Sequence, residues 1–459
     1  MNNFRMSDIK ENAHIHFIGI GGISMSALAE ICIARGYVIS GSDIKESHIT
    51  RKLADLGAKL YFAHAPENVR GADLVVYTAA INPQNSELTG AQESGIRCVE
   101  RSSFLGALMH DYGCGICIAG THGKTTTTSM MSHVLLKCEC DPTIMLGGEL
   151  DAIGGNMRIG KSGYFLTEAC EYHCSFLEFF PKIAVITNVD ADHLDFFGDI
   201  EHIKQAFADF AALVPEDGYV VVCGDNKNAM ECVSNAAAEV ITYGFDDKNI
   251  FCPENLTYNN GCGEFDVEYD GEIVHAALRA AGEHNVYNAL ACFAAGYALG
   301  LCGSDVAAGL MEFGFVHRRF EQKGMCGGAY VIDDYAHHPT EICCTLKTAR
   351  RMCENKLYVV FQPHTYTRTR LLIDEFEKAF DNADEIIVTD IYAAREKDTG
   401  LIHASELADR LKKRGKNARY ISSFDDIGKT LKNELMPGDT VITMGAGNVY
   451  KIGEAIAEN

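Results

Sequence analysis

The sequence predicts an α/β protein of three domains, and three observations carry this prediction. The chain has 459 residues, which is too long for one ordinary hydrophobic core. Short apolar strands alternate with stretches of helical periodicity, as in parallel sheets covered by helices. Two glycine-rich turns, Gly19–Ser24 and Gly120–Thr126, each follow a strand and open a helix, which is how α/β folds commonly bind phosphate groups.

Composition and charge exclude several classes of protein. A net charge of −23 argues against a nucleic-acid binder, which needs a basic face. The N-terminus is polar, without the apolar core of a signal peptide, and no apolar run approaches the roughly 20 residues of a membrane span. We therefore expect a cytoplasmic protein without membrane or nucleic-acid partners, in which local donors hold any bound phosphate.

The first domain is expected to span residues 1–112, with a break near His110–Gly113. Its pattern opens with a strand and a helix on either side of the first glycine-rich turn. The expected elements are the strand His14–Ile20, the helix Ser24–Arg35, and the strands Tyr37–Ser40 and Leu74–Thr78.

The second domain is expected to span residues 113–316 and to hold the second glycine-rich turn. An inserted segment, Phe265–Val274, carries Asp270-Gly271, a hairpin turn signal, and the apolar helix Asn285–Leu299 follows it. The expected strands are Ile116–Ala119, Tyr164–Thr167, Ala184–Thr187 and Tyr219–Cys223.

The third domain is expected to span residues 317–459, because the strand–helix rhythm restarts after Phe315–Phe320. Its expected strands are Tyr330–Asp333, Leu357–Phe361, Ile386–Thr389 and Val441–Met444.

The eighteen cysteines of the chain do not form a disulfide framework. Several stand singly in apolar runs, where a free thiol behaves as a small hydrophobe. Cys114 and Cys117 have the spacing of a zinc or redox pair, but no second pair accompanies them and their segment is expected to be a buried strand. We therefore expect free thiols in a reducing compartment.

The second glycine-rich turn predicts a nucleotide site. Loop amides and the helix dipole of Gly120–Thr126 would face the phosphates, Lys124 would reach the β and γ groups, and the Thr125 hydroxyl would bind Mg²⁺. Ile118 stands where the eight-residue Walker pattern has glycine, so the turn is a tighter variant. The turn is therefore expected to bind a nucleotide, and its residues are Gly120, Thr121, His122, Gly123, Lys124, Thr125 and Thr126.

The first glycine-rich turn is compatible with a dinucleotide fold. Asp43 ends the following strand, where an acidic residue meets a ribose hydroxyl in such folds. The third glycine of the fingerprint is replaced by Ser24, however, and a partial fingerprint is weak evidence. An NAD-linked oxidoreductase is therefore one hypothesis, but two phosphate turns in one chain favour two phosphorylated ligands.

Five motifs, taken together and in this order, resemble the Mur ligases over nearly the whole chain. They are Gly19–Ser26 (GIGGISMS), Gly120–Thr126 (GTHGKTT), Asp190–Asp195 (DADHLD), Gly282–Asn288 (GEHNVYN) and Asp333–Pro339 (DDYAHHP). The resemblance implies a Rossmann-like UDP-binding domain, a P-loop ATPase-like central domain and a Rossmann-like C-terminal domain that closes over the site. It is strongest to the member of the family that adds alanine.

The resemblance also implies a reaction and its partners. The lactyl carboxylate of UDP-N-acetylmuramate would attack the γ-phosphate of ATP to give an acyl phosphate, and the amine of L-alanine would then displace phosphate. This is a step of peptidoglycan precursor synthesis. The protein would act as a monomer or a homodimer.

Residue roles follow from the same resemblance. The expected catalytic residues are Lys124, Glu168, His193 and Arg319. The metal, Mg²⁺ or Mn²⁺, would be bound by Thr125, Glu168 and His193. Outside the turn, ATP would also contact Asn285, Asn288, Arg319 and Asp334. The substrates would contact Gly21, Gly22, Ser24, Met25, Asp43, Thr78, His338, His364 and Arg368.

Two departures from the family pattern bear on these roles. Arg368 would fork onto the carboxylate of the amino acid, but Thr365 stands where relatives often have a second arginine. Sister ligases carry a carbamylated lysine where this chain has Phe207, and Lys204 is out of register. Its absence agrees with the alanine-adding member, and leaves Glu168 and His193 as the expected metal ligands.

Three alternatives remain open from the sequence. The nearest is the recycling ligase that attaches an intact tripeptide to UDP-muramate. The second is the NAD-linked oxidoreductase, which would have no use for Lys124. The third is a nucleotide-binding regulator without catalysis, which the set of metal and phosphate ligands disfavours.

Overall fold

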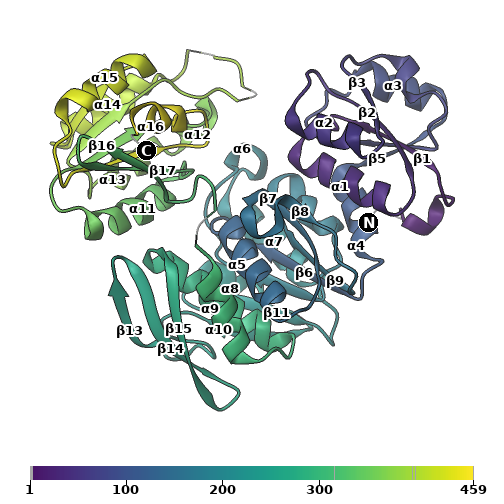
Figure 1. The fold of residues 1–459 in the computed structure, drawn as a ribbon, viewed down its shortest axis with the longest axis horizontal. Helices are drawn as coiled ribbons and strands as arrows, with labels where there is room; N and C mark the ends of the chain where they lie inside the picture. Colours follow the sequence, from purple (N-terminus) through teal and green to yellow (C-terminus); the bar gives the residue numbers. More distant parts are fainter. Residues whose placement is uncertain (1–3, 315, 395, 399, 458–459) are drawn as a thin grey trace. The chain divides into compact units, whose positions relative to one another are not determined.

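A computed structural model of the protein describes residues 4–314, 316–394, 396–398 and 400–457 (Figure 1). Phe315, next to the domain boundary expected at residue 316, lies outside these residues. The chain divides into two compact units. The first runs up to Val189 and includes Lys204–Thr242 and Ala294–Leu301. The second comprises Asp190–Ile203, Tyr243–Phe293 and the chain from Cys302 onward.

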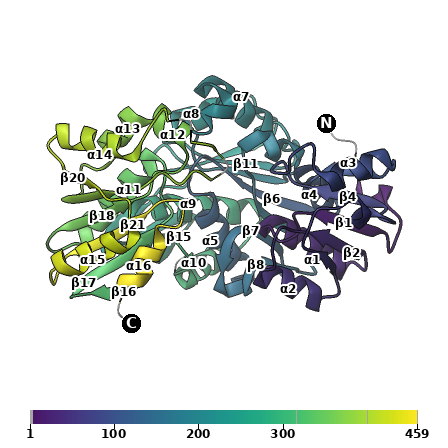
Figure 2. The same ribbon diagram turned by 90° about the horizontal axis from the view of Figure 1, so that it is seen from above.

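The first sheet of the first unit has five parallel strands in the order β3-β2-β1-β4-β5. It lies in the purple and blue part of the chain in Figures 1 and 2. The strands are β1 (His14–Ile18), β2 (Val38–Ser42), β3 (Lys59–Tyr61), β4 (Leu74–Tyr77) and β5 (Arg97–Glu100). The helices are η1 (Met6–Asp8), α1 (Ile23–Ala34), α2 (His48–Asp55), η2 (Pro66–Val69), α3 (Ser86–Glu93) and α4 (Arg101–Met109).

The second sheet has seven strands in the order β12-β11-β10-β6-β9-β7-β8. β6 pairs in parallel with β9 and β10 at its centre, whereas β8 pairs antiparallel with β7 at the edge. The strands are β6 (Cys114–Ala119), β7 (Thr143–Leu150), β8 (Gly155–Arg158), β9 (Tyr164–Glu168), β10 (Ile183–Ile186), β11 (Tyr219–Cys223) and β12 (Glu239–Tyr243).

The helices that follow these strands begin with α5, which starts at the second glycine-rich turn. Those of this part of the chain are α5 (Lys124–Lys137), η3 (Asp151–Ile153), η4 (Tyr172–Glu178), α6 (Leu194–Phe197), α7 (Ile200–Ala211) and α8 (Lys227–Cys232). The central strand β6 is buried over five of its six residues, from Gly115 to Ala119. Such a continuous apolar strand is what a parallel sheet covered on both faces requires.

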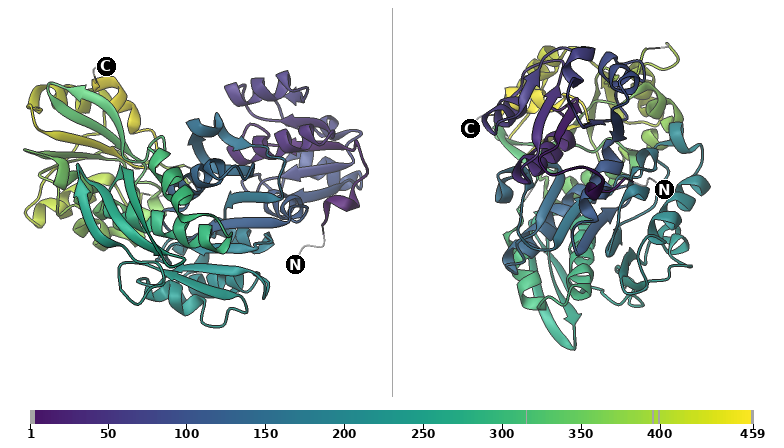
Figure 3. Two further views of the ribbon diagram at one scale, coloured as in Figure 1. Left: turned by 60° about the horizontal axis from the view of Figure 1, so that its bottom comes forward. Right: turned by 90° about the vertical axis from the view of Figure 1, so that its right-hand side faces the viewer.

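The second unit contains an antiparallel sheet of three strands, β13-β14-β15. Tyr269 pairs with Glu272 around the Asp270-Gly271 turn, so the expected hairpin is confirmed. Figure 3 shows this sheet as long strands in teal and green. The elements are β13 (Glu254–Asn259), β14 (Cys262–Tyr269), β15 (Glu272–Ala281), α9 (Glu283–Ala298) and α10 (Gly303–Glu312).

The second unit also contains a sheet of six strands in the order β16-β17-β21-β18-β19-β20. It is parallel except for β16, which pairs antiparallel with β17. The strands are β16 (Glu321–Cys326), β17 (Ala329–Asp334), β18 (Leu357–Phe361), β19 (Glu385–Val388), β20 (Asn417–Tyr420) and β21 (Thr440–Met444). The helices are α11 (Pro339–Met352), α12 (Tyr366–Leu371), α13 (Ile373–Ala379), α14 (Ala404–Lys413), α15 (Phe424–Glu434) and α16 (Tyr450–Ile456).

Two apolar clusters cover opposite faces of this six-stranded sheet. Val359 and Phe361 of β18 belong to one cluster, with α11, α13 and α14, and Val360 belongs to the other, with α15 and α16. The alternation along β18 is the period-two pattern of a strand buried on both sides.

All strands expected from the sequence are present, with ends shifted by at most a few residues. The expected domain limits at residues 112 and 316 stay predictions. Among the described residues, no helix has the length and apolar character needed to cross a membrane.

Candidate active site

The second glycine-rich turn is a tight loop between β6 and α5. Gly120 has φ 134°, and a Cβ there would lie 1.9 Å from the Thr187 hydroxyl. Gly123, with φ 84°, lies immediately before Lys124, the first residue of α5. Both positions therefore require glycine, and the helix N-terminus is left open to an anion.

Two side chains that the sequence analysis missed hold this loop. The amide of His122 donates to Oδ1 of Asn188 at 2.9 Å. The carbonyl of His122 accepts from the Thr187 hydroxyl at 2.7 Å and from Nδ2 of Asn188 at 3.0 Å. Thr187 and Asn188 directly follow β10, the strand beside β6, and that position was the available signal.

Lys124 is turned into the loop and paired with a third missed residue, Glu171. Its Nζ donates to the two Glu171 oxygens at 2.9 and 3.1 Å, and to the carbonyls of Gly120 and Thr121. Burial lowers the pKa of Lys124, but Glu171 and the neighbouring acidic groups together outweigh burial and hold the pKa above its usual value. The lysine is therefore charged, and a phosphate can replace Glu171 as its partner.

Two of the three expected metal ligands lie together. The Thr125 hydroxyl donates to Oε2 of Glu168 at 2.9 Å, and the amide of Gly147 donates to Oε1 at 2.6 Å. A hydroxyl and a carboxylate on one spot are hard oxygen donors, which suit Mg²⁺. Thr125 and Glu168 belong to the first unit. His193, the third expected ligand, belongs to the second unit, where its amide donates to Asp192 at 2.7 Å.

No lysine takes the place of the carbamylated residue of the sister ligases. Phe207 on α7 is fully buried and stacks edge-on against Phe176 at 5.3 Å. Lys204 instead pairs with Glu231 at 2.6 Å. Phe207 has no amine to carbamylate, and Lys204 is engaged by Glu231. Neither residue therefore supplies a metal-bridging carbamate to Glu168.

The first glycine-rich turn is held by Asp43, which the sequence analysis expected to meet a ribose. Oδ2 of Asp43 accepts from the amide of Gly21 at 2.9 Å, and Oδ1 accepts from the amide of Ile44 at 2.7 Å. A Cβ at Gly21 would lie 2.7 Å from Oδ2. Asp43 therefore shapes the turn, while its role toward a ribose stays a prediction.

Four other residues expected to bind the first substrate surround this turn. Gly22 caps α1, and Ser24 and Met25 lie in the first turn of that helix. Thr78 directly follows β4, and its hydroxyl accepts weakly from the amide of Ala80 at 3.4 Å. All four lie at the carboxyl edge of the first sheet, where ligands of such sheets bind.

In the second unit, Arg368 on α12 is paired with Asp192. Nε and one terminal nitrogen of Arg368 donate to Oδ1 of Asp192 at 3.1 and 2.9 Å. The other terminal nitrogen donates to Nδ1 of His364 at 2.9 Å. Thr365 accepts from the amide of Arg368 at 3.4 Å and so caps the helix.

Charge and burial set the protonation states of this cluster. Burial raises the pKa of Asp192, but Arg368 and the neighbouring histidines together outweigh burial and hold the pKa well below its usual value. Burial lowers the pKa of His364 to about 3 and that of His337 to about 4. Asp192 is therefore ionised and both imidazoles are neutral near pH 7, so Arg368 is the cation of this group.

Arg318 and Arg319 have different surroundings. Arg318 lies between the rings of Tyr335 and Tyr450, at 4.8 and 4.7 Å, and donates to Asp333 at 3.3 Å. Arg319 contacts the same Tyr335 ring at 4.9 Å. Among the described residues its guanidinium makes no hydrogen bond, so Arg319 is the more available of the two for a ligand.

Asp334, expected at the nucleotide, is buried and bonded to the backbone. Its carboxylate accepts from the amides of Phe320 at 3.0 Å and Ala336 at 2.7 Å. Burial raises the pKa of Asp334 to about 7, although Arg319 lowers it. The side chain therefore fixes the segment that carries Arg319.

Asn285 and Asn288 stand one turn apart on α9, as expected. Nδ2 of Asn285 donates to the carbonyl of Ala281 at 2.8 Å, and Nδ2 of Asn288 donates to Oδ1 of Asn285 at 3.1 Å. The bonds tie the helix start to β15, and contact with an adenine stays a prediction.

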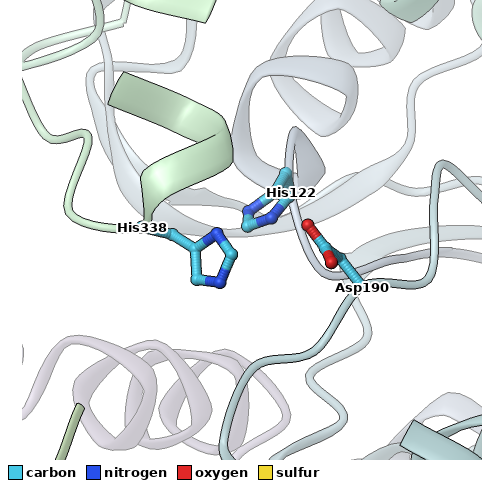
Figure 4. A group of neighbouring side chains, drawn as sticks. All are labelled: His122, Asp190 and His338. Atoms are coloured by element: carbon cyan, nitrogen blue, oxygen red, sulfur yellow. The ribbon is translucent and has the colours of Figure 1, made fainter. Parts of the chain in front are cut away.

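His338 caps α11 and bonds to the loop of Asp190. Its Nδ1 accepts from the amide of Thr340 at 3.3 Å, its Nε2 lies 3.2 Å from the carbonyl of Ala191, and the Thr340 hydroxyl donates to Asp190 at 2.7 Å. Figure 4 shows the side chains of Asp190 and His338 from this unit. A contact of His338 with substrate remains a prediction.

Three family models match the chain in succession. They are described as "Mur ligase family, catalytic domain" over residues 14–112, "Mur ligase middle domain" over residues 118–296, and "Mur ligase, glutamate ligase domain" over residues 318–447.

Relatives and solved structures match over nearly the same length. A UDP-N-acetylmuramate–L-alanine ligase of Caldanaerobacter subterraneus subsp. tengcongensis is 50% identical over 98% of each chain. One of Acetivibrio thermocellus is 51% identical over 99% of this chain and 97% of its own. The crystal structure of a UDP-N-acetylmuramate-alanine ligase from Thermotoga maritima has a TM-score of 0.79 and 30% identity, covering 96% of this chain and 98% of that one.

A murein peptide ligase from Psychrobacter arcticus shares the fold, with a TM-score of 0.70 and 24% identity over 97% of this chain and 98% of its own. The matched models and relatives span both glycine-rich turns and the Arg368 cluster. The chain belongs to the Mur ligase family.

Proposed function

We propose that the protein uses ATP to join L-alanine to the lactyl carboxylate of UDP-N-acetylmuramate, a step of peptidoglycan precursor synthesis in the cytosol. The observation that carries the proposal is the Lys124 loop, whose amides, lysine and neighbouring Glu168 suit the phosphates and metal of ATP. The alanine ligases that are about half identical to this chain support the choice of substrates.

The first step would be attack of a carboxylate oxygen on the γ-phosphorus, with ADP as the leaving group. Two anions must approach each other, so positioning and neutralisation of charge supply most of the catalysis. The loop amides and the N-terminus of α5 would bind the phosphates, and Lys124 would leave Glu171 to reach the β and γ groups. Arg319 would add a second cation.

Thr125 and Glu168 would hold Mg²⁺, with His193 as a third ligand. The bound ion would neutralise part of the negative charge of the phosphates. Since a histidine nitrogen is a softer donor than a carboxylate, His193 would also admit Mn²⁺.

The second step would be attack of the alanine amine on the acyl carbon, with loss of phosphate. Arg368 would orient the amino acid by forking onto its carboxylate, which requires the fork to exchange Asp192 for the substrate. Thr365 offers a hydroxyl rather than a second cation at this subsite.

An assay of the purified protein decides between this proposal and the tripeptide-recycling alternative. ATP and UDP-N-acetylmuramate are supplied with either L-alanine or the L-alanyl-γ-D-glutamyl-diaminopimelate tripeptide, and the nucleotide product is weighed by mass spectrometry. The proposal expects the alanyl product and phosphate release with L-alanine. If the protein ligates the tripeptide but not L-alanine, the recycling activity replaces the proposal. Turnover of a nicotinamide cofactor would favour the oxidoreductase.

A further inference from the structure

The two glycine-rich turns belong to one compact unit, and one hairpin contacts the surroundings of both. The hairpin consists of β7 and β8 with η3 between them, and it spans Thr143–Arg158. The helix that the first turn opens, α1, lies against both strands of the hairpin (Figure 2). The hairpin is therefore placed to connect the first turn with the second.

On β7, Gly147 holds Glu168, the expected metal ligand. The amide of Gly147 donates to Oε1 of Glu168 at 2.6 Å, and a Cβ on this glycine would lie 3.0 Å from Oε2. The other oxygen, Oε2, accepts from the Thr125 hydroxyl in the first turn of α5. A movement of the hairpin away from the second turn would therefore release one oxygen of the carboxylate.

On β8, Asn156 is bonded to the first turn. Its Nδ2 donates to the carbonyl of Ile23 at 3.1 Å. Ile23 is the first residue of α1 and directly follows Gly22. The amides at this helix start are the donors that a phosphate would meet. Asn156 thus contacts the segment that is expected to bind the sugar nucleotide.

The hairpin is a stiff connection between these two contacts. Its strands pair on both sides of a shift in register, and Met157, next to Asn156, is buried. At the base of the hairpin Arg158 pairs with Asp141 at 2.5 Å. A shift of Asn156 is therefore passed on to Gly147, because little between them can absorb it.

The first sheet is attached to the rest of the unit through a second and much closer contact, at α4. A Cβ on Gly106 of α4 would lie 1.9 Å from the carbonyl of Glu178 in η4, and the Ser103 hydroxyl donates to the Glu178 carboxylate at 3.0 Å. At α1, in contrast, Asn156 makes one neutral hydrogen bond, which changes an equilibrium constant by about fivefold. The contact at α1 can therefore form and break while α4 keeps the sheet attached.

We propose that Asn156 is a positioning residue that couples binding of the sugar nucleotide at the first turn to binding of metal-bound ATP at the second. This inference rests on the proposed function, which supplies both nucleotides. A nucleotide on the first turn orders the start of α1, and the bond to Asn156 then holds the hairpin where the Gly147 amide meets Glu168. Each ligand thus prepares the site of the other, since a coupling free energy acts equally in both directions.

The coupling serves a reaction between two anions. ATP that binds without the sugar nucleotide finds Glu168 less firmly held, so its γ-phosphate is less exposed to attack by water. The metal site becomes complete when the carboxylate that is to be phosphorylated is also bound. Sites that are completed by the correct pair of ligands limit such side reactions.

Isothermal titration of the full chain measures the coupling. UDP-N-acetylmuramate is titrated with and without saturating Mg²⁺ and a non-hydrolysable ATP analogue, and the ratio of the two dissociation constants is the coupling factor. The wild type should bind UDP-N-acetylmuramate more tightly when the analogue is present. In Asn156→Ala the coupling factor should fall by about fivefold, the effect of one lost hydrogen bond. Each ligand alone should bind this variant within about twofold of its wild-type affinity.

His48→Ala is the matched control. His48 of α2 and Glu149 of β7 form an exposed pair at 3.8 Å, so this variant removes another contact between the hairpin and the first sheet, away from the glycine-rich turn. Its coupling factor should stay at the wild-type value.

A wild-type coupling factor of one overturns the inference. So does an Asn156→Ala protein in which both dissociation constants change by the same factor, because a merely structural role leaves their ratio unchanged. If alanine is still joined to UDP-N-acetylmuramate in either case, the proposed function stands and only the coupling fails. A wild type that does not bind UDP-N-acetylmuramate overturns both.

Discussion

Arg368 binds Asp192 through one edge of its guanidinium: Nε lies 3.1 Å from Oδ1, and a terminal nitrogen lies 2.9 Å from Oδ1 and 3.2 Å from Oδ2. A carboxylate of the chain itself thus occupies the fork that a substrate carboxylate is proposed to use. Asp192 precedes His193, an expected metal ligand. Release of Arg368 by the incoming amino acid would therefore also free the segment next to His193.

Arg368→Lys should raise the KM for L-alanine at least about tenfold, since an ammonium keeps the charge but cannot make the two parallel bonds of the fork. The KM for ATP should change less than about twofold. Steady-state kinetics with each substrate varied in turn measure both constants. Arg370→Lys, on the exposed side of the same helix, is the matched control. An unchanged KM for L-alanine would remove Arg368 from the amino-acid subsite.

Glu168→Ala should abolish the Mg²⁺-dependent formation of product, because the Thr125 hydroxyl alone cannot hold the ion. The fold should survive, since the substitution removes no buried apolar volume. Product formation across a Mg²⁺ titration gives the first result and circular dichroism gives the second. Glu149→Ala changes an exposed carboxylate at the end of the neighbouring strand β7 and should leave the Mg²⁺ dependence as it is. The metal role is refuted by a variant that responds to Mg²⁺ like the wild type.

The sequence predicts the centre of each parallel sheet well and their edges poorly. β11 and β18 have the expected limits because Tyr219–Cys223 and Leu357–Phe361 are unbroken apolar runs between turn signals. β8 (GNMR) and β16 (EQKGMC) escaped prediction. Each is an antiparallel edge strand, so it has neither the continuous apolar run nor the helix that follows a parallel strand.

The sequence predicted those residues of the candidate site that lie in recognisable motifs or at the end of a predicted strand. Lys124, Thr125 and Glu168 were expected from one turn and one strand end, and their grouping is found. Glu171 and Asn188 were not expected, because their partners are 47 and 66 residues away and only the pairing of strands brings them together. Pairings of that range have no local signal in one sequence.

Acid should unfold the protein partly through Glu87. Although burial opposes it, hydrogen bonds from neighbouring side chains hold the pKa of Glu87 at about 2 in the folded protein, against an ordinary value of 4.5. The native state therefore favours the charged form. This stabilisation is complete above about pH 5 and is lost as the pH falls toward 2, an effect of roughly 3 kcal/mol at 1.36 kcal/mol per unit. Glu87→Gln should be less stable at pH 7 and lose less stability than the wild type between pH 5 and 3. Denaturant melts at these pH values measure the difference, and parallel losses in both proteins would contradict it.

Lys124→Ala should abolish ATP-dependent ligation, because the phosphates lose their one lysine in the loop and Glu171 remains as an unpaired buried anion facing them. Binding of UDP to the first sheet should persist within about twofold, since Lys124 is not part of the first glycine-rich turn. Turnover and titration with UDP measure these quantities separately. Lys137→Ala, at the far end of α5, should keep full activity. Ligation at the wild-type rate in Lys124→Ala would dismiss the loop as the ATP site.

The two units should approach each other when both nucleotides are bound. Lys124 belongs to the first unit and Arg319 to the second, and the proposed transfer needs both cations on one triphosphate. Small-angle scattering should give a smaller radius of gyration with a non-hydrolysable ATP analogue and UDP-N-acetylmuramate than with either alone. In Arg319→Ala this decrease should be lost, while Arg318, held between Tyr335 and Tyr450, keeps the local fold. A radius that stays constant in the wild type with both ligands at saturation would mean that Arg319 acts elsewhere, and the acyl phosphate would have to form with the cations of the first unit alone.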